Sequence, residues 1–336
     1  MKVDCMKLIS ELEKIHKVSR LSDIPVELTF QENKVLAYTT NSDISILTSF
    51  QANGAENRKI LVDGEAFFKM AKVLSGEVFL SVTEGKLTLS CEKTRFSLPI
   101  LQTSIPKFNF QKKDSLYVPL KKILSLTTFF KSEFFILTFH DDKILFWTHD
   151  GIQLVVFLYQ TKNTINKTFS IPFSSLSILS TFSEDPVAIS CYDNHIVFSS
   201  DSHVAVRAID QEVPDISQVT DFQPFGTMKV NRKRLIETLK RISKASEHPH
   251  YETQVVLEED NLKFSTFYPW ISFTEKLSVE ETNQKVNLRF NSLCFLKALK
   301  TMHEDFVTIS WKEKGIMKVT EQSDHSYYLM QIVPEA

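Results

Sequence analysis

Hydrophobic positions along the chain follow two periodicities, one helical and one typical of strands. In "VNRKRLIETLKRISKA", residues 230–245, Leu235, Leu239 and Ile242 recur at helical spacing, and Asn231 is a suitable N-cap. The six basic residues of this stretch, set against one acid, leave the apolar stripe clear. The stretch therefore predicts an amphipathic helix with a buried apolar side and a positively charged outer side.

Five other stretches share this pattern, in which a short apolar strand leads through a cap or turn residue into a helix of about ten to fourteen residues. The six strands end 53 to 60 residues apart, at Val3, Val62, Val118, Ile171, Val230 and Phe290. The residues that follow them are Asp4, Asp63, Pro119, Pro172, Asn231 and Asn291. We therefore predict six similar units along the chain.

Strand-like runs with turn signals separate the helices, and "TEGK" (83–86) and "HDDK" (140–143) are natural hairpin tips. Each unit is thus one helix with about three or four mostly antiparallel strands, an α+β pattern that buries its helix better in pairs. Pairing neighbours predicts three domains, residues 1–113, 114–223 and 224–336. The second join, "QVTDFQPFG" (218–226), has the expected proline and glycine.

Charge is segregated between the helices and the rest of the chain. The 336 residues have a formal net charge of −2, but the six predicted helices together have +10, which leaves −12 elsewhere. In the first helix, Lys7, Lys14 and Lys17 are expected opposite the apolar stripe. A solvated outer face is the ordinary explanation for one such helix. Segregation over six helices favours a polyanion partner facing the helices.

Composition predicts an ordinary soluble globular protein, with 43% hydrophobic and 24% charged residues. Cys5, Cys91, Cys191 and Cys294 have no C-x-x-C spacing, so neither a disulfide framework nor a zinc site is indicated. The first residues carry acids where a signal peptide needs an apolar core, and no apolar run is long enough to span a membrane. We expect a reducing, cytoplasmic location.

Motifs for catalysis are missing from the sequence. It has no G-x-G-x-x-G, P-loop or H-E-x-x-H motif. His140 and His149 each neighbour an aspartate in or beside a predicted hairpin, so we interpret them as turn residues. His248 and His250 have only weak metal-ligand spacing. We expect a non-catalytic chain with no cofactor and no metal.

Several stretches resemble, in order along the whole chain, motifs of the bacterial DNA sliding clamp, the beta subunit of DNA polymerase III. "TRFSLPIL" (94–101) is similar to the signature that closes the first clamp domain, and "THDGIQLVV" (148–156) to a middle-domain motif. "VPDISQV" (213–219) resembles the motif at the second domain join. "LRFNSLCFLKAL" (288–299) and "YLMQIVPEA" (328–336) resemble the last helix cap and the C-terminal tail. We identify the chain as a divergent relative.

The resemblance implies three similar clamp domains, each made of two helix-plus-antiparallel-sheet repeats, and a head-to-tail homodimer that forms a six-domain ring. Helices would line the hole, and duplex DNA would pass through it. Sequence-independent phosphate contacts suit such sliding. The expected DNA-binding residues are Lys7, Lys14, Lys17, Lys69, Lys72, Lys121, Lys122, Lys233, Lys240, Arg241 and Lys244.

A second site implied by the resemblance is a cleft for short linear peptides of the polymerase, the clamp loader and other proteins. Its expected residues are Gly151, Ile152, Gln153, Leu154, Pro214, Gln218, Val219, Asn291, Val333 and Pro334. The family's His-Arg pair is Ile152-Gln153 here, its second join arginine is Gln218, and Glu335-Ala336 replaces an apolar residue and an arginine. Ordinary interdomain packing is the alternative for these residues.

Two other functions remain open from the residues alone. Abundant phenylalanine, 27 residues, allows a platform that stacks single-stranded nucleic acid, although Phe129, Phe130, Phe134 and Phe135 stand in apolar runs typical of a core. A protein-interaction scaffold with no nucleic-acid role is the third possibility. Short linear single strands would bind tightly to a stacking platform, but not to a clamp.

Overall fold

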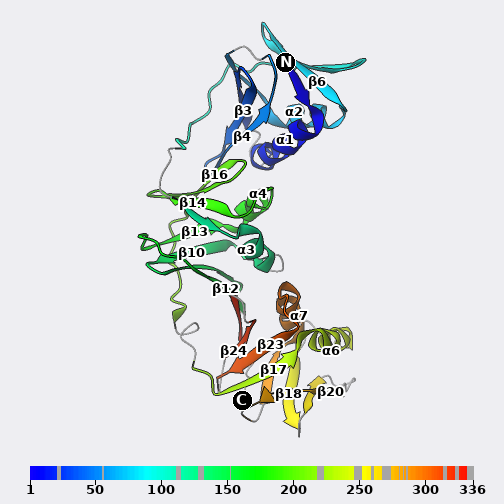
Figure 1. Ribbon diagram of the computed structural model, residues 1–336, viewed down its shortest axis with the longest axis vertical. Helices are drawn as coiled ribbons and strands as arrows, with labels where there is room; N and C mark the ends of the chain where they lie inside the picture. Colours follow the sequence, from blue (N-terminus) through cyan, green and yellow to red (C-terminus); the bar gives the residue numbers. More distant parts are fainter. Residues whose placement is uncertain are drawn as a thin grey trace. The chain divides into compact units, whose positions relative to one another are not determined.

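The computed structural model describes most of the chain. The described residues are 1–20, 24–54, 57–110, 115–127, 132–151, 153–217, 223–245, 252–258, 261–266, 274–279, 281–282, 284, 287–312, 316–321 and 325–330. They fold as α+β, with antiparallel sheets and short helices, which confirms the predicted fold class (Figure 1).

The chain divides into two compact units, residues 1–121 with 171–210, and residues 122–170 with 211–336. The division into three domains at residues 113 and 223 stays a prediction. Each unit contains one large sheet and one four-stranded sheet. Among the described residues, no helix is both long and apolar enough to cross a membrane.

The first unit has an eight-stranded and a four-stranded sheet. The large sheet runs β5 (Arg58–Asp63), β2 (Pro25–Gln31), β3 (Lys34–Thr40), β4 (Ile44–Gln51), β16 (His203–Arg207), β15 (His195–Ser199), β14 (Val187–Cys191) and β9 (Leu116–Val118). The small sheet runs β1 (Lys2–Asp4), β6 (Glu77–Thr83), β7 (Lys86–Cys91) and β8 (Thr94–Pro99).

The second unit repeats this plan with nine and four strands. The large sheet runs β13 (Lys167–Pro172), β10 (Phe134–His140), β11 (Lys143–His149), β12 (Gln153–Gln160), β25 (His325–Met330), β24 (Ile316–Thr320), β23 (Phe306–Trp311), β17 (Gly226–Asn231) and β21 (Glu281–Thr282). The small sheet runs β20 (Thr274–Ser278), β19 (Asn261–Thr266), β18 (Glu252–Glu258) and β22 (Asn287–Asn291). Turns join β6 to β7 and β10 to β11, as "TEGK" and "HDDK" predicted.

Helices begin where the six repeats predicted. They are α1 (Cys5–Ser19), α2 (Gly64–Lys72), α3 (Leu120–Thr127), α4 (Leu176–Leu179) after the 3-10 turn η1 (Phe173–Ser175), α6 (Arg232–Ala245) and α7 (Ser292–Thr301). Side chains of Asp4, Asp63 and Asn291 accept hydrogen bonds from backbone N–H groups of the first turn, which confirms them as N-caps. Helix α1 packs beside α2, and α6 beside α7 (Figure 1).

The apolar stripes of the helices form their buried sides. Leu8, Leu12 and Ile15 of α1 are at most 1% exposed, and the stripe of α6 is fully buried. Burying one such side chain stabilises the fold by about 1.5–3 kcal/mol. The stripe therefore fixes which side of each helix is left for charged residues.

The helix after Pro172 is much shorter than predicted. Instead of ten or more helical residues, the chain makes η1 and the four-residue α4. The serine hydroxyls of this stretch donate to nearby backbone carbonyls, as Ser175 does to Pro172 and Ser177 to Ser174. Serine is a weak helix former, and the four serines between residues 174 and 180 explain the short helix.

Strands are exchanged between neighbouring repeats. The opening strand of the first repeat, β1, joins β6, β7 and β8 of the second, while β5 of the second joins β2, β3 and β4 of the first. The same exchange places β9 with the strands of the fourth repeat and β13 with those of the third, and it recurs with β17 and β22 in the last two repeats. Each repeat therefore needs its neighbour to complete its sheet.

Candidate nucleic-acid interface and peptide cleft

The most basic helix, α6, presents its charge on the side opposite its buried stripe. Arg234, Lys240 and Lys244 are exposed and have no side-chain hydrogen bond or ion pair to other described residues. Lys7 of α1 is also exposed, and its side chain has no hydrogen bond or ion pair within the described part of the first unit. The residue pattern had not singled out Arg234, although it lies in the same stretch. These four cations are available to bind anions.

Two other cations of α6 are paired with carboxylates. Lys233 Nζ lies 2.8 Å from Asp305 Oδ1. The Arg241 guanidinium forms a two-pronged ion pair with Glu275, with its Nε 2.8 Å from Oε2. Hydrogen bonds from Arg241 hold the pKa of Glu275 below its usual value. Both carboxylates come from outside the helix.

The remaining expected DNA-binding lysines are also engaged, but all except Lys14 stay at least partly exposed. The contacts are Lys17 Nζ to the Ser177 carbonyl at 3.1 Å, Lys69 to Glu65 at 2.5 Å, Lys72 over the Phe68 ring at 4.9 Å, Lys121 to the Ser183 carbonyl at 2.6 Å, and Lys122 over the Phe157 ring at 5.4 Å. Surface contacts of this kind are weak, so these lysines can still contact a polyanion.

Lys14 does not lie on an exposed face, in contrast to its expected place. Its side chain is 3% exposed, and its Nζ lies 2.7 Å from Asp201 Oδ2, 2.9 Å from Glu11 Oε2 and 3.1 Å from Ser202 Oγ. The turn between β15 and β16 supplies Asp201 and Ser202, so a residue pattern confined to the first repeat cannot reveal them. Lys14 is a structural residue, and we omit it from the interface.

Arg232 shows a further structural use of a cation in α6. Its Nε donates to the Glu304 carbonyl at 2.6 Å and its Nη1 to the Leu299 carbonyl at 3.2 Å. These carbonyls lie at and just beyond the C-terminal end of α7, where helices have unsatisfied acceptors. Arg232 therefore fastens α7 to α6.

In the candidate peptide cleft, the described residues come together in the second unit. Gly151 has φ of 89°, a conformation that favours glycine, and Gln153 N donates to Asp150 Oδ1 at 2.8 Å. Leu154 belongs to a buried cluster with Ile136, Trp147 and Val156, against which Val213 and Ile216 of the join motif pack. The middle-domain motif and the join motif therefore pack together in one apolar cluster.

The first turn of α7 lies beside Asp150 and Gln153 of the middle-domain motif. Asn291 Oδ1 accepts from Cys294 N at 3.0 Å. Burial, with a smaller contribution from the charge of Asp150, raises the pKa of the Cys294 thiol to about 11, and Gln153 hydrogen-bonds to that thiol. Pro214 is exposed. Ile152, Gln218, Val219, Val333 and Pro334 lie outside the described residues, as do His248 and His250.

The shifted thiol gives a direct test of this packing. Thiolate is the reactive form, so a rise from 9.0 to about 11 predicts that Cys294 reacts with iodoacetamide roughly a hundredfold more slowly than in the unfolded chain at neutral pH. Peptide mass mapping after timed alkylation measures this rate. An equal rate in the folded and unfolded chain would contradict the partly buried position of Cys294.

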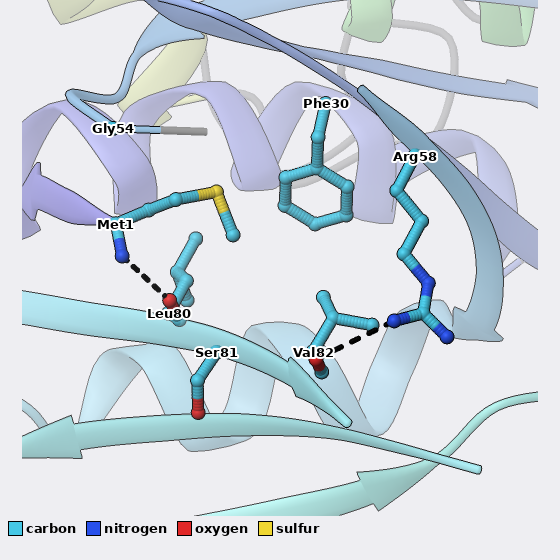
Figure 2. A pocket seen from close by; sticks show the side chains of 7 residues that line it. All are labelled: Met1, Phe30, Gly54, Arg58, Leu80, Ser81 and Val82. Atoms are coloured by element: carbon cyan, nitrogen blue, oxygen red, sulfur yellow. Dashed lines mark hydrogen bonds between the residues drawn. The ribbon is translucent and has the colours of Figure 1, made fainter. Parts of the chain in front are cut away.

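A cavity of about 210 Å³ lies between the two sheets of the first unit (Figure 2). It is lined by Met1, Phe30, Gly54, Arg58, Leu80, Ser81 and Val82. The Met1 ammonium donates to the Leu80 carbonyl at 2.9 Å, and the Arg58 guanidinium to the Val82 carbonyl at 3.5 Å. Both cations thus bind backbone acceptors of β6, and we assign the cavity a packing role.

Comparison with solved structures identifies the fold. The chain is similar to a DnaN sliding clamp, the DNA polymerase III beta subunit of Pseudomonas aeruginosa, with TM-score 0.88, 16% identity and 99% of each chain covered. It is also similar to the DNA polymerase sliding clamp of Bacillus subtilis, with TM-score 0.86 and 16% identity, and to the DNA polymerase III beta subunit of Thermotoga maritima, with TM-score 0.85 and 16% identity, each over 99% of both chains. No protein-family model and no curated protein matches. Across its whole length, the chain therefore has the fold of a bacterial DNA sliding clamp.

Proposed function

We propose that the chain is a DNA sliding clamp, a non-catalytic processivity subunit that encircles duplex DNA and tethers a replicative polymerase. The observation that carries this proposal is the similarity in fold to polymerase III beta subunits over 99% of both chains. The exposed cations of the helices support it, because phosphate contacts from such residues are independent of sequence.

The edges of the sheets support a closed homodimer. In each large sheet, the last strand of one repeat pairs with the last strand of another, β4 with β16 and β12 with β25. Strand β8 of the second repeat and strand β20 of the fifth repeat instead stand at the ends of their four-stranded sheets. Exposed edges are templates for pairing with another chain. We propose that β8 of one copy pairs with β20 of the other, which closes the ring.

The partly buried side chains of Val213 and Ile216, which pack against the cluster of Leu154, mark the proposed docking place for short linear peptides of the polymerase, the clamp loader and other proteins. A clamp of this kind works in the cytoplasm. The changed residues of the cleft motifs imply that it selects a different peptide from its relatives.

Solution mass and imaging test the assembly. We expect light scattering to give twice the chain mass of 38.7 kDa and negative-stain images of the same peak to show closed rings. Retention should be greater on circular duplex DNA than on the same DNA after linearisation, because a ring slides off free ends. A monomer without rings at any concentration, with equal retention on both DNA forms, would contradict the proposal.

A further inference from the structure

Some of the basic residues that are proposed to face DNA already form ion pairs with carboxylates of the protein. On α6 these are Lys233 with Asp305 and Arg241 with Glu275, and neither carboxylate belongs to the helix. Three neighbouring cations, Arg234, Lys240 and Lys244, have no such partner among the described residues. Helix α6 thus has two kinds of basic residue, those paired with a carboxylate and those without such a partner. The pairing reduces the charge that α6 can offer to DNA, and this effect suggests a function for the two acids.

The Glu275 carboxylate is held firmly in place. It lies on β20, is 21% exposed, and accepts the Thr238 hydroxyl at 2.6 Å in addition to Arg241. The guanidinium of Arg241 offers Glu275 a two-pronged set of donors, which is also the set that binds a phosphate. A DNA phosphate must therefore displace Glu275 or share Arg241 with it.

Asp305 is fixed through its backbone. Its carbonyl accepts from Arg232 N at 2.8 Å, which keeps the residue beside the first turn of α6. Its carboxylate pairs with Lys233, whose side chain is 69% exposed. The pair is open to solvent, so a phosphate can compete for the lysine.

Building on the proposed clamp function, we propose that Glu275 and Asp305 are built-in competitors of DNA phosphate that weaken the grip of α6 on the duplex. The unpaired cations supply a general attraction, while the paired cations contact phosphate only at the cost of their carboxylate. Because a clamp is retained by its topology, weak contacts favour sliding. The two acids therefore favour a clamp that slides on DNA over one that binds it tightly.

The test compares three isosteric variants of the full chain. Glu275→Gln keeps the acceptor for Thr238, and Asp305→Asn keeps the backbone bond to Arg232. Glu212→Gln, an exposed acid with no ion pair to the described residues, is the matched control for net charge. Fluorescence anisotropy of a labelled duplex across a salt series gives the apparent affinity and its salt dependence.

We expect the first two variants to bind the duplex roughly two- to fivefold more tightly at about 100 mM salt, with a plot of log affinity against log salt steeper by about 0.9 for each released cation. Glu212→Gln should change the affinity and its salt dependence only as far as the loss of one negative charge from the whole molecule does. Affinities equal to that of the control would overturn the proposal.

A double-mutant cycle separates this proposal from the clamp function itself. In an Arg241→Gln background, Glu275→Gln should no longer tighten binding, because no cation is released. Tightening that persists in this background would overturn the competitor role. If neutralising Arg234, Lys240 and Lys244 leaves duplex binding unchanged, the clamp function fails as well. If that neutralisation weakens binding but the acid variants do not strengthen it, only the competitor role fails.

Discussion

Replacing Lys14 with alanine is expected to lower the free energy of unfolding by about 3 kcal/mol, the lower end of the range for breaking a buried ion pair. The Lys14 side chain is 3% exposed, and Glu11 and Asp201 are 16% and 19% exposed. Removal of the ammonium leaves two largely buried carboxylates facing each other without compensation. Urea unfolding followed by circular dichroism measures the loss.

The control for this prediction is Lys69→Ala, which removes a lysine of the same unit from an exposed pair with Glu65. Little change is expected there, because solvent screens such pairs. Equal losses in the two variants, or no loss in Lys14→Ala, would contradict the structural role of Lys14.

Acidification gives a second measurement on the same network. Burial acts to raise the pKa of Asp201, but hydrogen bonds from Lys14 and Ser183 outweigh it and hold that pKa below the ordinary 3.8. The resulting stability is complete above the unfolded-state pKa and is lost as pH falls through the lower folded-state value. We expect Lys14→Ala to lose stability at neutral pH and to show a weaker acid dependence below pH 3.8.

Local features of the fold were predictable because they depend on neighbours in sequence. Asp4, Asp63 and Asn291 were expected to cap helices, and each does, since a cap needs only a suitable oxygen two or three residues before a free N–H. Likewise, the stripe of Leu235, Leu239 and Ile242 is fully buried, because helical spacing alone places the three residues on one side.

Features that depend on distant residues were not predictable in this way. Lys14 was expected on the outer side of α1, but Asp201 and Ser202, 187 and 188 residues further along the chain, enclose it. The exchange of β1 and β5 between the first two repeats leaves no mark on either repeat alone. The family resemblance implied the clamp fold, whereas helix periodicity and charge indicated only six similar repeats whose helices together are positively charged.

The peptide cleft lies between these two cases. Leu154 and Pro214 were expected in one cleft only because of the family resemblance. The structure packs Val213 and Ile216, the apolar neighbours of Pro214 in the join motif, against the cluster that contains Leu154. The contact of Gln153 with Cys294 had no counterpart in the sequence pattern, since nothing in "THDGIQLVV" indicates a thiol partner. Five of the expected cleft residues lie outside the described part of the chain, so the role of this surface stays a proposal.

Neutralising the three unpaired cations of α6 together, as Arg234→Gln, Lys240→Gln and Lys244→Gln, is expected to weaken duplex binding on the order of a hundredfold at about 50 mM salt. In a dimer this removes three phosphate contacts from each copy. The slope of log affinity against log salt concentration should therefore become less steep by about 5. All three side chains are exposed, so the fold and the dimer should persist, which thermal melting and light scattering check.

The matched control neutralises the exposed Lys34, Lys93 and Lys162, which lie in or beside connections between strands. It removes the same charge, so an equal loss of binding would show that net charge, and not helix α6, attracts the DNA. A loss confined to the α6 variant would mean that this helix faces the duplex, and it would tie the segregation of charge in the sequence to the function of the ring.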